Sequence, residues 1–128
     1  MKMKIKAEIL TYIIFGLLTT VVNIAIFLFF TDVLKINYII SNIIAWFLSV
    51  LFAYITNRIW VFESINDNII KELSLFYVGR VFSGVVDTLL LYILISIFSV
   101  GVFTSKIIVQ VLVVILNYVI SKVIVFKE

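Results

Sequence analysis

Four of the ionisable side chains that lie in or at the ends of long hydrophobic stretches, where a charge is costly, could bind a ligand. Three are the cations Arg58, Arg80 and Lys122, and the fourth is the acid Asp87. Cations at the depth of lipid headgroups can bind phosphate, and the planar fork of Arg is especially suited to it. Simple membrane anchoring is the other interpretation of Arg58 and Lys122.

Asp87 is the deepest of these charged residues. It follows Leu73 by 14 residues, which is about 21 Å along a helix in a hydrocarbon core of about 30 Å. A carboxyl group there must be protonated, paired or in a wet cavity. Arg80 leans toward the N-terminus of its own helix and away from Asp87. Asp87 is therefore a functional candidate, and a structural polar contact is the alternative.

Amide side chains recur at helical spacing in the same stretches. Two interpretations stay open for them, because such residues either join packed helices or line a polar interior. The small residues near them favour helix packing, and Lys106 is interpreted as an outer anchor. The candidate amides are Asn23, Asn57, Gln110 and Asn117; their neighbours at helical spacing are Gly16, Thr19, Thr20, Asn42, Trp46, Ser49, Ala53, Ser83, Gly84 and Ser121.

Two similar strings indicate that the chain is a tandem duplication. Residues 54–62 read Tyr-Ile-Thr-Asn-Arg-Ile-Trp-Val-Phe, and residues 118–126 read Tyr-Val-Ile-Ser-Lys-Val-Ile-Val-Phe. The offset of 64, from Phe62 to Phe126, also aligns Asp87 with Asn23. We expect a first repeat at about 1–64 and a second at about 65–128.

The composition predicts the elements that hold these residues. The chain is 65% hydrophobic and 13% charged, whereas soluble domains are closer to half apolar and a quarter charged. Hydrophobic stretches at about 9–31, 38–62, 73–98 and 102–126 are each long enough to span a membrane. We predict an all-α membrane protein whose single domain, 1–128, has four transmembrane helices in two parallel two-helix repeats.

The distribution of basic residues predicts the orientation. Eight of the ten basic residues lie at the N-terminus, around the 62–72 connection or at the C-terminal end, and two lie on the other side. Both chain ends should face the cytoplasm, and the first hydrophobic stretch is too long for a cleaved signal. The eight are Lys2, Lys4, Lys6, Arg58, Lys71, Arg80, Lys122 and Lys127, and the two are Lys35 and Lys106.

The residue types that are absent exclude several kinds of chemistry. There is no Cys and no His, so thiolate catalysis, disulfides and the commonest general base and metal ligand are absent. No phosphate-cradling glycine loop occurs, and the basic residues form no patch for nucleic acid. We expect a protein that is not an enzyme, with no cofactor, no metal and no nucleic-acid partner.

The chain resembles the GtrA-like family over nearly its whole length. The resemblance rests on Gly16 followed by Asn23, on the string Asn57-Arg58-Ile-Trp60-Val61-Phe62 with its weaker copy ending at Phe126, and on Gly79-Arg80 with Asp87. Ser121-Lys122 departs from the usual Asn-Arg pair of the copy. Asn23 stands where the family often has an acid, which leaves Asp87 as the lone central carboxylate.

The resemblance implies a flippase of the bacterial cytoplasmic membrane. Members of the family are linked to glycosylation of cell-surface polysaccharides and teichoic acids, through movement of a polyprenyl-phosphate-linked sugar. On this basis Arg58, Arg80 and Lys122 would bind the phosphate. Asp87 and the amides Asn23, Asn57, Gln110 and Asn117 would contact the sugar or line a polar groove.

Two other functions remain open for the sequence. A cation exporter like the small multidrug-resistance transporters also has four spans, but its acid lies in the first span, where this chain has Glu8 only at the edge. A non-transporting membrane partner of a glycosyltransferase is the other. Four short helices enclose little volume, so we expect a homo-oligomer.

Overall fold

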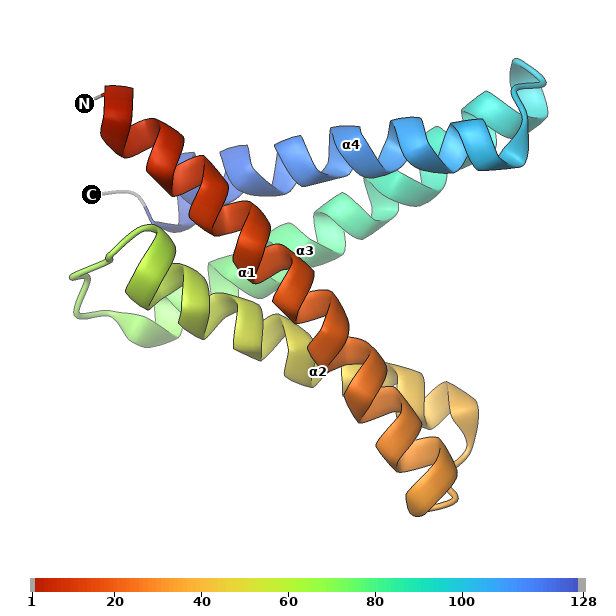
Figure 1. Ribbon diagram of the computed structural model, residues 1–128, viewed down its shortest axis with the longest axis horizontal. Helices are drawn as coiled ribbons and strands as arrows, with labels where there is room; N and C mark the ends of the chain where they lie inside the picture. The colour runs from red at the N-terminus through yellow and green to blue at the C-terminus, as the bar shows by residue number, and fades with distance from the viewer. Residues whose placement is uncertain (1, 127–128) are drawn as a thin grey trace. The chain divides into compact units, whose positions relative to one another are not determined.

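The computed structural model describes residues 2–126, and nearly all of them are helical. Its long helices are α1 (Lys2–Leu28), α2 (Tyr38–Thr56), α3 (Ile69–Tyr92) and α4 (Val102–Ile120) (Figure 1). The described residues form no strand. Each helix, with the turn that ends it, is long and apolar enough to cross a membrane. The prediction of an all-α membrane protein with four spanning helices is confirmed.

The helices begin earlier than hydropathy indicates. α1 begins at Lys2 and α3 at Ile69, ahead of the apolar stretches that start near 9 and 73. The first residues of α1 are Lys, Met, Ala and Glu, which favour helix. In α3 the Asn68 side chain accepts a hydrogen bond from the Lys71 backbone N–H at 3.2 Å, and this cap fixes the start of the helix.

The chain divides into two compact units, Met1–Ile65 and Asn66–Glu128. Each unit is a helical hairpin: α1 packs against α2 in unit 1, and α3 packs against α4 in unit 2 (Figure 1). The division falls close to the predicted repeat boundary. The orientation of the units in the membrane stays a prediction, and Lys127, one of the counted basic residues, lies outside the described residues.

Several local features recur at the offset of 64 residues. Tyr12 and Phe62 lie with ring centroids 6.4 Å apart in unit 1, and their counterparts Phe76 and Phe126 lie 6.0 Å apart in unit 2. Ser41 and its counterpart Ser105 are both completely buried at the start of the second helix of their hairpin. These matching contacts agree with a duplication, which itself stays a prediction.

Every helix ends in a wider π-helical turn that the sequence did not predict. These turns are η1 (Phe29–Val33), η2 (Asn57–Val61), η3 (Ile93–Ile97) and η4 (Ser121–Val125). The backbone N–H of Phe62 donates to the Asn57 carbonyl at 2.8 Å, and Phe126 donates to Ser121 at the same distance. Such turns are rare and often occur at functional sites. Here η2 holds Arg58 and η4 holds Lys122.

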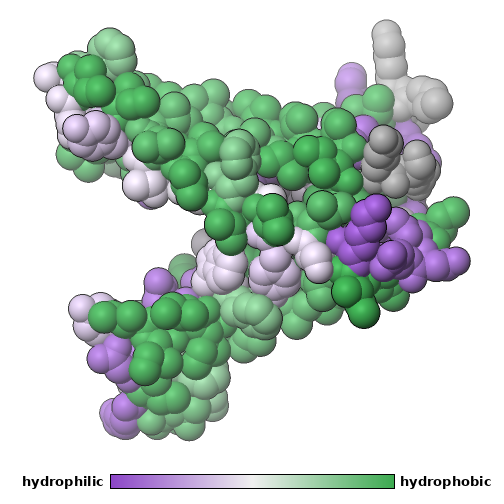
Figure 2. Space-filling model, turned by 180° about the vertical axis from the view of Figure 1, so that it is seen from behind, coloured by the Kyte–Doolittle hydropathy of each residue, from purple (hydrophilic) through white to green (hydrophobic). Residues whose placement is uncertain are grey.

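The outer faces of both hairpins are apolar, as a lipid-facing surface requires. Figure 2 shows hydrophobic residues over most of the visible surface, with the most hydrophilic residues mainly toward the ends of the helices. Large side chains such as Leu17, Phe47 and Val111 are more than half exposed on α1, α2 and α4. Water would not tolerate so much exposed apolar surface, whereas hydrocarbon does.

The buried face of α2 is a ridge of small residues. Ser41, Ala45, Ser49 and Ala53 follow one another at four-residue spacing, and none is more than 5% exposed. Small residues on a ridge let another helix approach closely. The interpretation of Ser49 and Ala53 as packing residues fits this ridge. Asn42 and Trp46, which stand at helical spacing from the ridge, are exposed, and their place in a polar interior stays a prediction.

Candidate functional site

In unit 1 the predicted groove residue Asn23 is engaged by the neighbouring helix. Its Nδ2 atom donates a hydrogen bond to Ser49 Oγ across α1 and α2 at 3.0 Å. Ser49 Oγ in turn donates to the Trp46 carbonyl at 3.0 Å. Hydrogen bonds of this kind join helices inside membranes. Asn23 thus contributes to packing of the first hairpin.

In unit 2 the same two positions carry different chemistry. Asp87 is the counterpart of Asn23, and Val113, which is 7% exposed, is the counterpart of Ser49. A valine side chain offers no hydrogen bond. The half-buried Asp87 carboxylate makes no hydrogen bond or ion pair within the described part of unit 2. The second hairpin therefore keeps a central acid that its own helices do not satisfy.

Two predicted amides lie near the depth of Asp87 on α4. A Cβ atom at Gly79 would lie 2.9 Å from Ile120, and this close approach fixes the register of the antiparallel pair α3 and α4. Eight residues farther along α3, Asp87 is level with about residue 112 of α4, between Gln110 and Asn117. Gln110 is exposed and Asn117 half-buried, and neither side chain is hydrogen-bonded within the described residues of unit 2.

Hydroxyl groups near these positions bond to their own helices. Thr19 Oγ1 donates to the Phe15 carbonyl at 2.8 Å, and Thr20 Oγ1 donates to Gly16 at 3.2 Å. In α3, Ser83 Oγ donates to the Arg80 carbonyl at 3.1 Å. A hydroxyl satisfied by its own turn can face a neighbouring helix without an added cost. These bonds fit the packing interpretation of the small residues.

Arg80 is held by an aromatic ring on its own helix. Its guanidinium carbon lies 4.7 Å from the centroid of the Phe76 ring. Phe76 is 2% exposed, and the ring of Phe126 meets it at an angle of 60°. The guanidinium thus points back toward the helix N-terminus, as helix geometry predicts. A cation over a ring face is attracted by the π-electrons while its N–H donors stay available.

Lys122 also has an aromatic partner one turn earlier on its helix. Its Nζ atom lies 3.5 Å from the Tyr118 hydroxyl oxygen, to which it donates a hydrogen bond, and 5.8 Å from the centroid of the ring. Lys122 belongs to the π-helical turn η4 and is half-buried. Both predicted phosphate ligands of unit 2, Arg80 and Lys122, therefore have an aromatic residue four positions before them as a partner.

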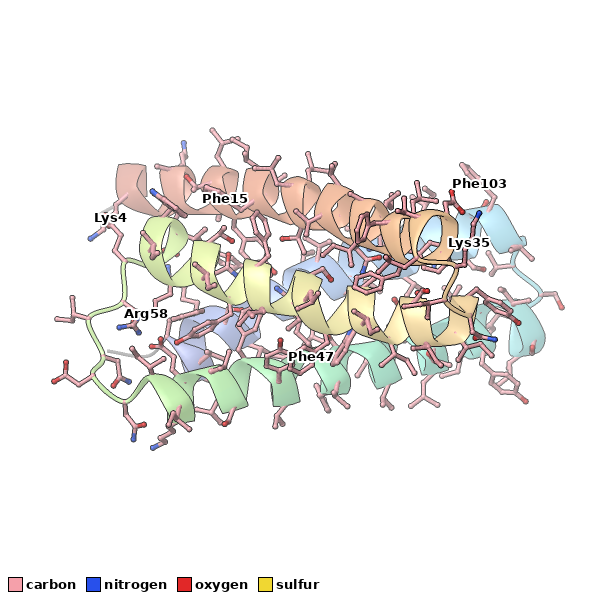
Figure 3. The ribbon with its side chains drawn as sticks, turned by 90° about the horizontal axis from the view of Figure 1, so that it is seen from below. Lys4, Phe15, Lys35, Phe47, Arg58 and Phe103 are labelled. Carbon is pink, nitrogen blue, oxygen red and sulfur yellow. The ribbon has the colours of Figure 1, made fainter. Side chains whose placement is uncertain are left out.

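Arg58 is tied to the connection that follows α2. Its Nη1 atom donates to Ser64 Oγ at 3.2 Å, and the Ser64 backbone N–H donates to the Arg58 carbonyl at 2.8 Å. Figure 3 shows Arg58 and Lys4 at one end of unit 1 and Lys35 at the other. Asn57, beside Arg58, is 3% exposed. The predicted phosphate ligand is thus at the hairpin end that carries the most basic residues.

The predicted site is distributed over both units. Asp87, Arg80 and Lys122 belong to unit 2, together with Gln110 and Asn117, whereas Arg58, Asn23 and Asn57 belong to unit 1. A common cluster of the three cations stays a prediction. Sequence reasoning missed Phe76, Tyr118 and Ser64, although an aromatic residue four positions before Arg80 and before Lys122 was a signal for the two aromatic partners.

The sequence matches the model of the GtrA/DPMS transmembrane domain over residues 11–126. The match covers the four spanning helices almost completely. The chain belongs to this family. The resemblance to GtrA-like proteins inferred from the sequence is therefore confirmed, and the chain is a multi-pass membrane protein.

Several bacterial proteins are similar to this chain over most of its length. The uncharacterized membrane protein YwcD of Bacillus subtilis is 40% identical over 91% of this chain and 94% of its own length. The cell wall teichoic acid glycosylation protein GtcA of Listeria innocua is 45% identical, and that of Listeria monocytogenes is 43% identical. Each of the two matches covers 94% of this chain and 85% of the relative.

Proposed function

We propose that this family member moves a polyprenyl-phosphate-linked sugar across the membrane to supply glycosylation of a cell-surface polymer. The Listeria relatives are named for cell wall teichoic acid glycosylation, which makes teichoic acid the first polymer to test. Such a substrate combines a phosphate, a polar sugar and a long apolar chain. A protein that moves it needs a cation, a polar contact deeper in the membrane and an opening to lipid.

The observation that carries the proposal is that one helix, α3, holds both a cation, Arg80, and an acid, Asp87. They are separated by seven residues, or about 10 Å along the helix axis. This is comparable to the distance from a lipid phosphate to the far side of an attached sugar. Arg80 keeps its N–H donors available over Phe76, and Asp87 has no hydrogen-bond partner in the described part of its hairpin. The arrangement fits a phosphate at one level and sugar hydroxyls at the next.

The proposed activity is transport without covalent chemistry. The chain has no Cys or His that would serve as nucleophile or general base. The sugar would reach the outer leaflet still attached to its phosphate. A membrane glycosyltransferase on the outer side would then use it, and this enzyme is a proposed functional partner. A homo-oligomer is proposed as well, because a second copy would supply further walls for a polar path through the membrane.

Reconstitution of the purified protein in liposomes tests the proposal. Polyprenyl-phosphate-linked glucose placed in one leaflet should appear in the other faster than in protein-free liposomes, as measured by its accessibility to an impermeant sugar-oxidising reagent. The Arg80→Ala protein provides the matched control for the same protein-to-lipid ratio. Failure to cross in the absence of a glycosyltransferase, with crossing restored by the enzyme, would favour the partner role over autonomous transport.

A further inference from the structure

We infer that the two units have different roles. In unit 2 Asp87 contacts the sugar, whereas in unit 1 Asn23 only stabilises the packing of α1 against α2. This inference rests on the proposed function, because it names the polar contact of that substrate. It departs from the expectation that Asn23 and Asp87 both contact the sugar or line a polar groove, and it assigns Asn23 to the packing alternative. The assignment follows from three differences between positions related by the offset of 64 residues.

The first difference is the cross-helix hydrogen bond. Asn23 and Ser49 form it at 3.0 Å in unit 1, and Val113 cannot supply the equivalent group in unit 2. A polar group deep in hydrocarbon is costly unless it is satisfied. One N–H of the Asn23 amide is already bonded to protein, so a ligand would gain less by contacting this side chain than by contacting one with no such bond. Asp87 lacks that bond and therefore gains from a ligand that donates hydrogen bonds.

The second difference is that unit 2 has further polar side chains on α4, near the depth of Asp87. On α4, Gln110 and Asn117 flank the level of Asp87, and neither side chain is hydrogen-bonded in the described part of unit 2. A carboxylate accepts hydrogen bonds, whereas an amide both donates and accepts. Neighbouring hydroxyls of a sugar have the matching capacity, because each both donates and accepts. A sugar is therefore a chemical match for these three groups.

The third difference is the position of the cation. Arg80 of unit 2 corresponds to Gly16 of unit 1, so only the second hairpin places a cation seven residues before its central polar residue. At the preceding position Gly79 of unit 2 corresponds to Phe15, whose ring stacks on Trp60 at 5.5 Å. At these two positions unit 1 has an aromatic contact, whereas unit 2 has a close approach of α3 to α4 at Gly79 and a positive charge at Arg80.

The assignment makes Asp87 responsible for discrimination between lipids with and without a sugar. An acceptor-only carboxylate contributes to binding only where the ligand supplies hydroxyl donors. The phosphate cations contact both lipids. The phosphate monoester of polyprenyl phosphate carries up to about one more negative charge than the diester of the glucose lipid, but this difference is the same for wild type and every variant, so only a change of the affinity ratio relative to wild type is informative. The ratio of the two affinities therefore isolates the role of Asp87 from that of Arg58, Arg80 and Lys122.

The first test measures binding of two probes to protein in nanodiscs. The probes are polyprenyl phosphate and polyprenyl-phosphate-linked glucose. Asp87→Asn should weaken binding of the glucose lipid about tenfold, because charge-assisted hydrogen bonds are lost, and should leave binding of polyprenyl phosphate unchanged. Asn23→Ala is the matched control, and it should lower the thermal stability while the ratio of the two affinities stays that of wild type.

A second test transfers the bond of unit 1 into unit 2. Val113→Ser supplies a hydroxyl opposite Asp87, as Ser49 does opposite Asn23, whereas Val113→Ala removes the same bulk without a hydroxyl. The serine hydroxyl would donate to the carboxylate and compete with the sugar. The Val113→Ser protein should therefore discriminate less between the two probes than the Val113→Ala protein does.

The outcomes separate this assignment from the proposed function. If wild type binds neither probe, the proposed function fails and the assignment fails with it. If wild type binds the glucose lipid more tightly but Asp87→Asn keeps the same ratio, only the assignment fails. If Asn23→Ala lowers the preference for the glucose lipid as much as Asp87→Asn does, the assignment also fails. If the ratio of the two lipid affinities is the same in Val113→Ser and Val113→Ala, the assignment also fails, because a hydroxyl bonded to Asp87 would then not compete with the sugar.

Discussion

At the scale of the residue, the binding of polyprenyl phosphate distinguishes two roles of Arg58, a membrane anchor and a ligand for phosphate. Its Nη1 atom contacts Ser64 Oγ at 3.2 Å, so its guanidinium is positioned at the end of the hairpin. Arg58→Ala should weaken binding of polyprenyl phosphate at least tenfold, since charge-assisted hydrogen bonds contribute about 1.5–3 kcal/mol each. Arg58→Lys should recover only part of it, because an ammonium lacks the planar fork.

Lys106→Ala is the control for Arg58, because Lys106 is an exposed cation on α4 outside the predicted phosphate cluster. Binding is measured by fluorescence with polyprenyl phosphate in nanodiscs, and folding by circular dichroism. Wild-type affinity in a folded Arg58→Ala protein would show that Arg58 is only an anchor.

Phe76 provides a second prediction at the scale of the residue. Its ring supports the Arg80 guanidinium at 4.7 Å, and such a contact contributes about 0.5–2 kcal/mol. Phe76→Leu should therefore weaken binding of polyprenyl phosphate by about 2-fold to 30-fold. Tyr12→Leu is the matched control, because Tyr12 is the buried counterpart in unit 1 and Gly16 follows it where Phe76 has Arg80.

The two Leu variants should lose similar thermal stability, since both remove a buried aromatic ring from an equivalent pair. Only the unit 2 variant should lose phosphate affinity. Equal affinity losses in Phe76→Leu and Tyr12→Leu would contradict a positioning role for Phe76, because they would point to general loosening of the hairpins.

The sequence predicted the chemistry of single residues better than their contacts. Depth and charge were enough to select Arg80 and Asp87, because a charge inside a hydrophobic stretch is informative by itself. The difference between Asn23 and Asp87 was not predicted. It depends on whether the facing residue on the second helix is Ser49 or Val113, and that pairing follows from the packing register.

At the scale of the element, Gly79 sets the distance between α3 and α4. An added Cβ atom would lie 2.9 Å from Ile120 Cγ2, too close without a shift of the Ile120 side chain or of one of the helices. Gly79→Ala should lower the free energy of unfolding by about 1–3 kcal/mol. Gly84→Ala on the same helix is the control, because nothing lies within 4 Å of its added Cβ atom, and alanine there should be neutral or stabilising by up to about 1 kcal/mol.

Thermal unfolding in one detergent measures both glycine variants. A Gly84→Ala protein less stable than Gly79→Ala would contradict the close approach of α3 and α4 at Gly79. The prediction is sharp because the two substitutions change the same residue type on the same helix. They differ only in the neighbour that the new methyl group meets.

Hydropathy predicted the helices correctly but not the form of their ends. Four hydrophobic stretches gave four spanning helices, because every backbone group in hydrocarbon must be bonded within its own segment. The π-helical turns were missed. Their sequences share only a β-branched last residue, Val33, Val61, Ile97 or Val125, and such residues also occur throughout the straight parts of the helices.

At the scale of the whole molecule, the 64-residue offset predicted the division into two hairpins but not their divergence. The aromatic pairs Tyr12–Phe62 and Phe76–Phe126 recur, each between the first half of the first helix and the end of the second helix of its own hairpin. The central positions differ, since the Asn23–Ser49 bond has no counterpart at Asp87 and Val113. Similar hairpins with unequal polar interiors allow one unit to provide stability while the other binds the substrate.

The orientation of the molecule gives the last prediction. Basic residues are retained on the cytoplasmic side during insertion, and eight of the ten lie at the two chain ends or around the 62–72 connection. Because the chain has no Cys, single cysteines report without background. Asp67→Cys should react with an impermeant maleimide only after the membrane is opened, and Lys35→Cys, in the α1–α2 connection, should react in intact cells. The reverse pattern would place the phosphate cations at the outer leaflet, and import or recycling of the lipid would then replace export as the direction to test.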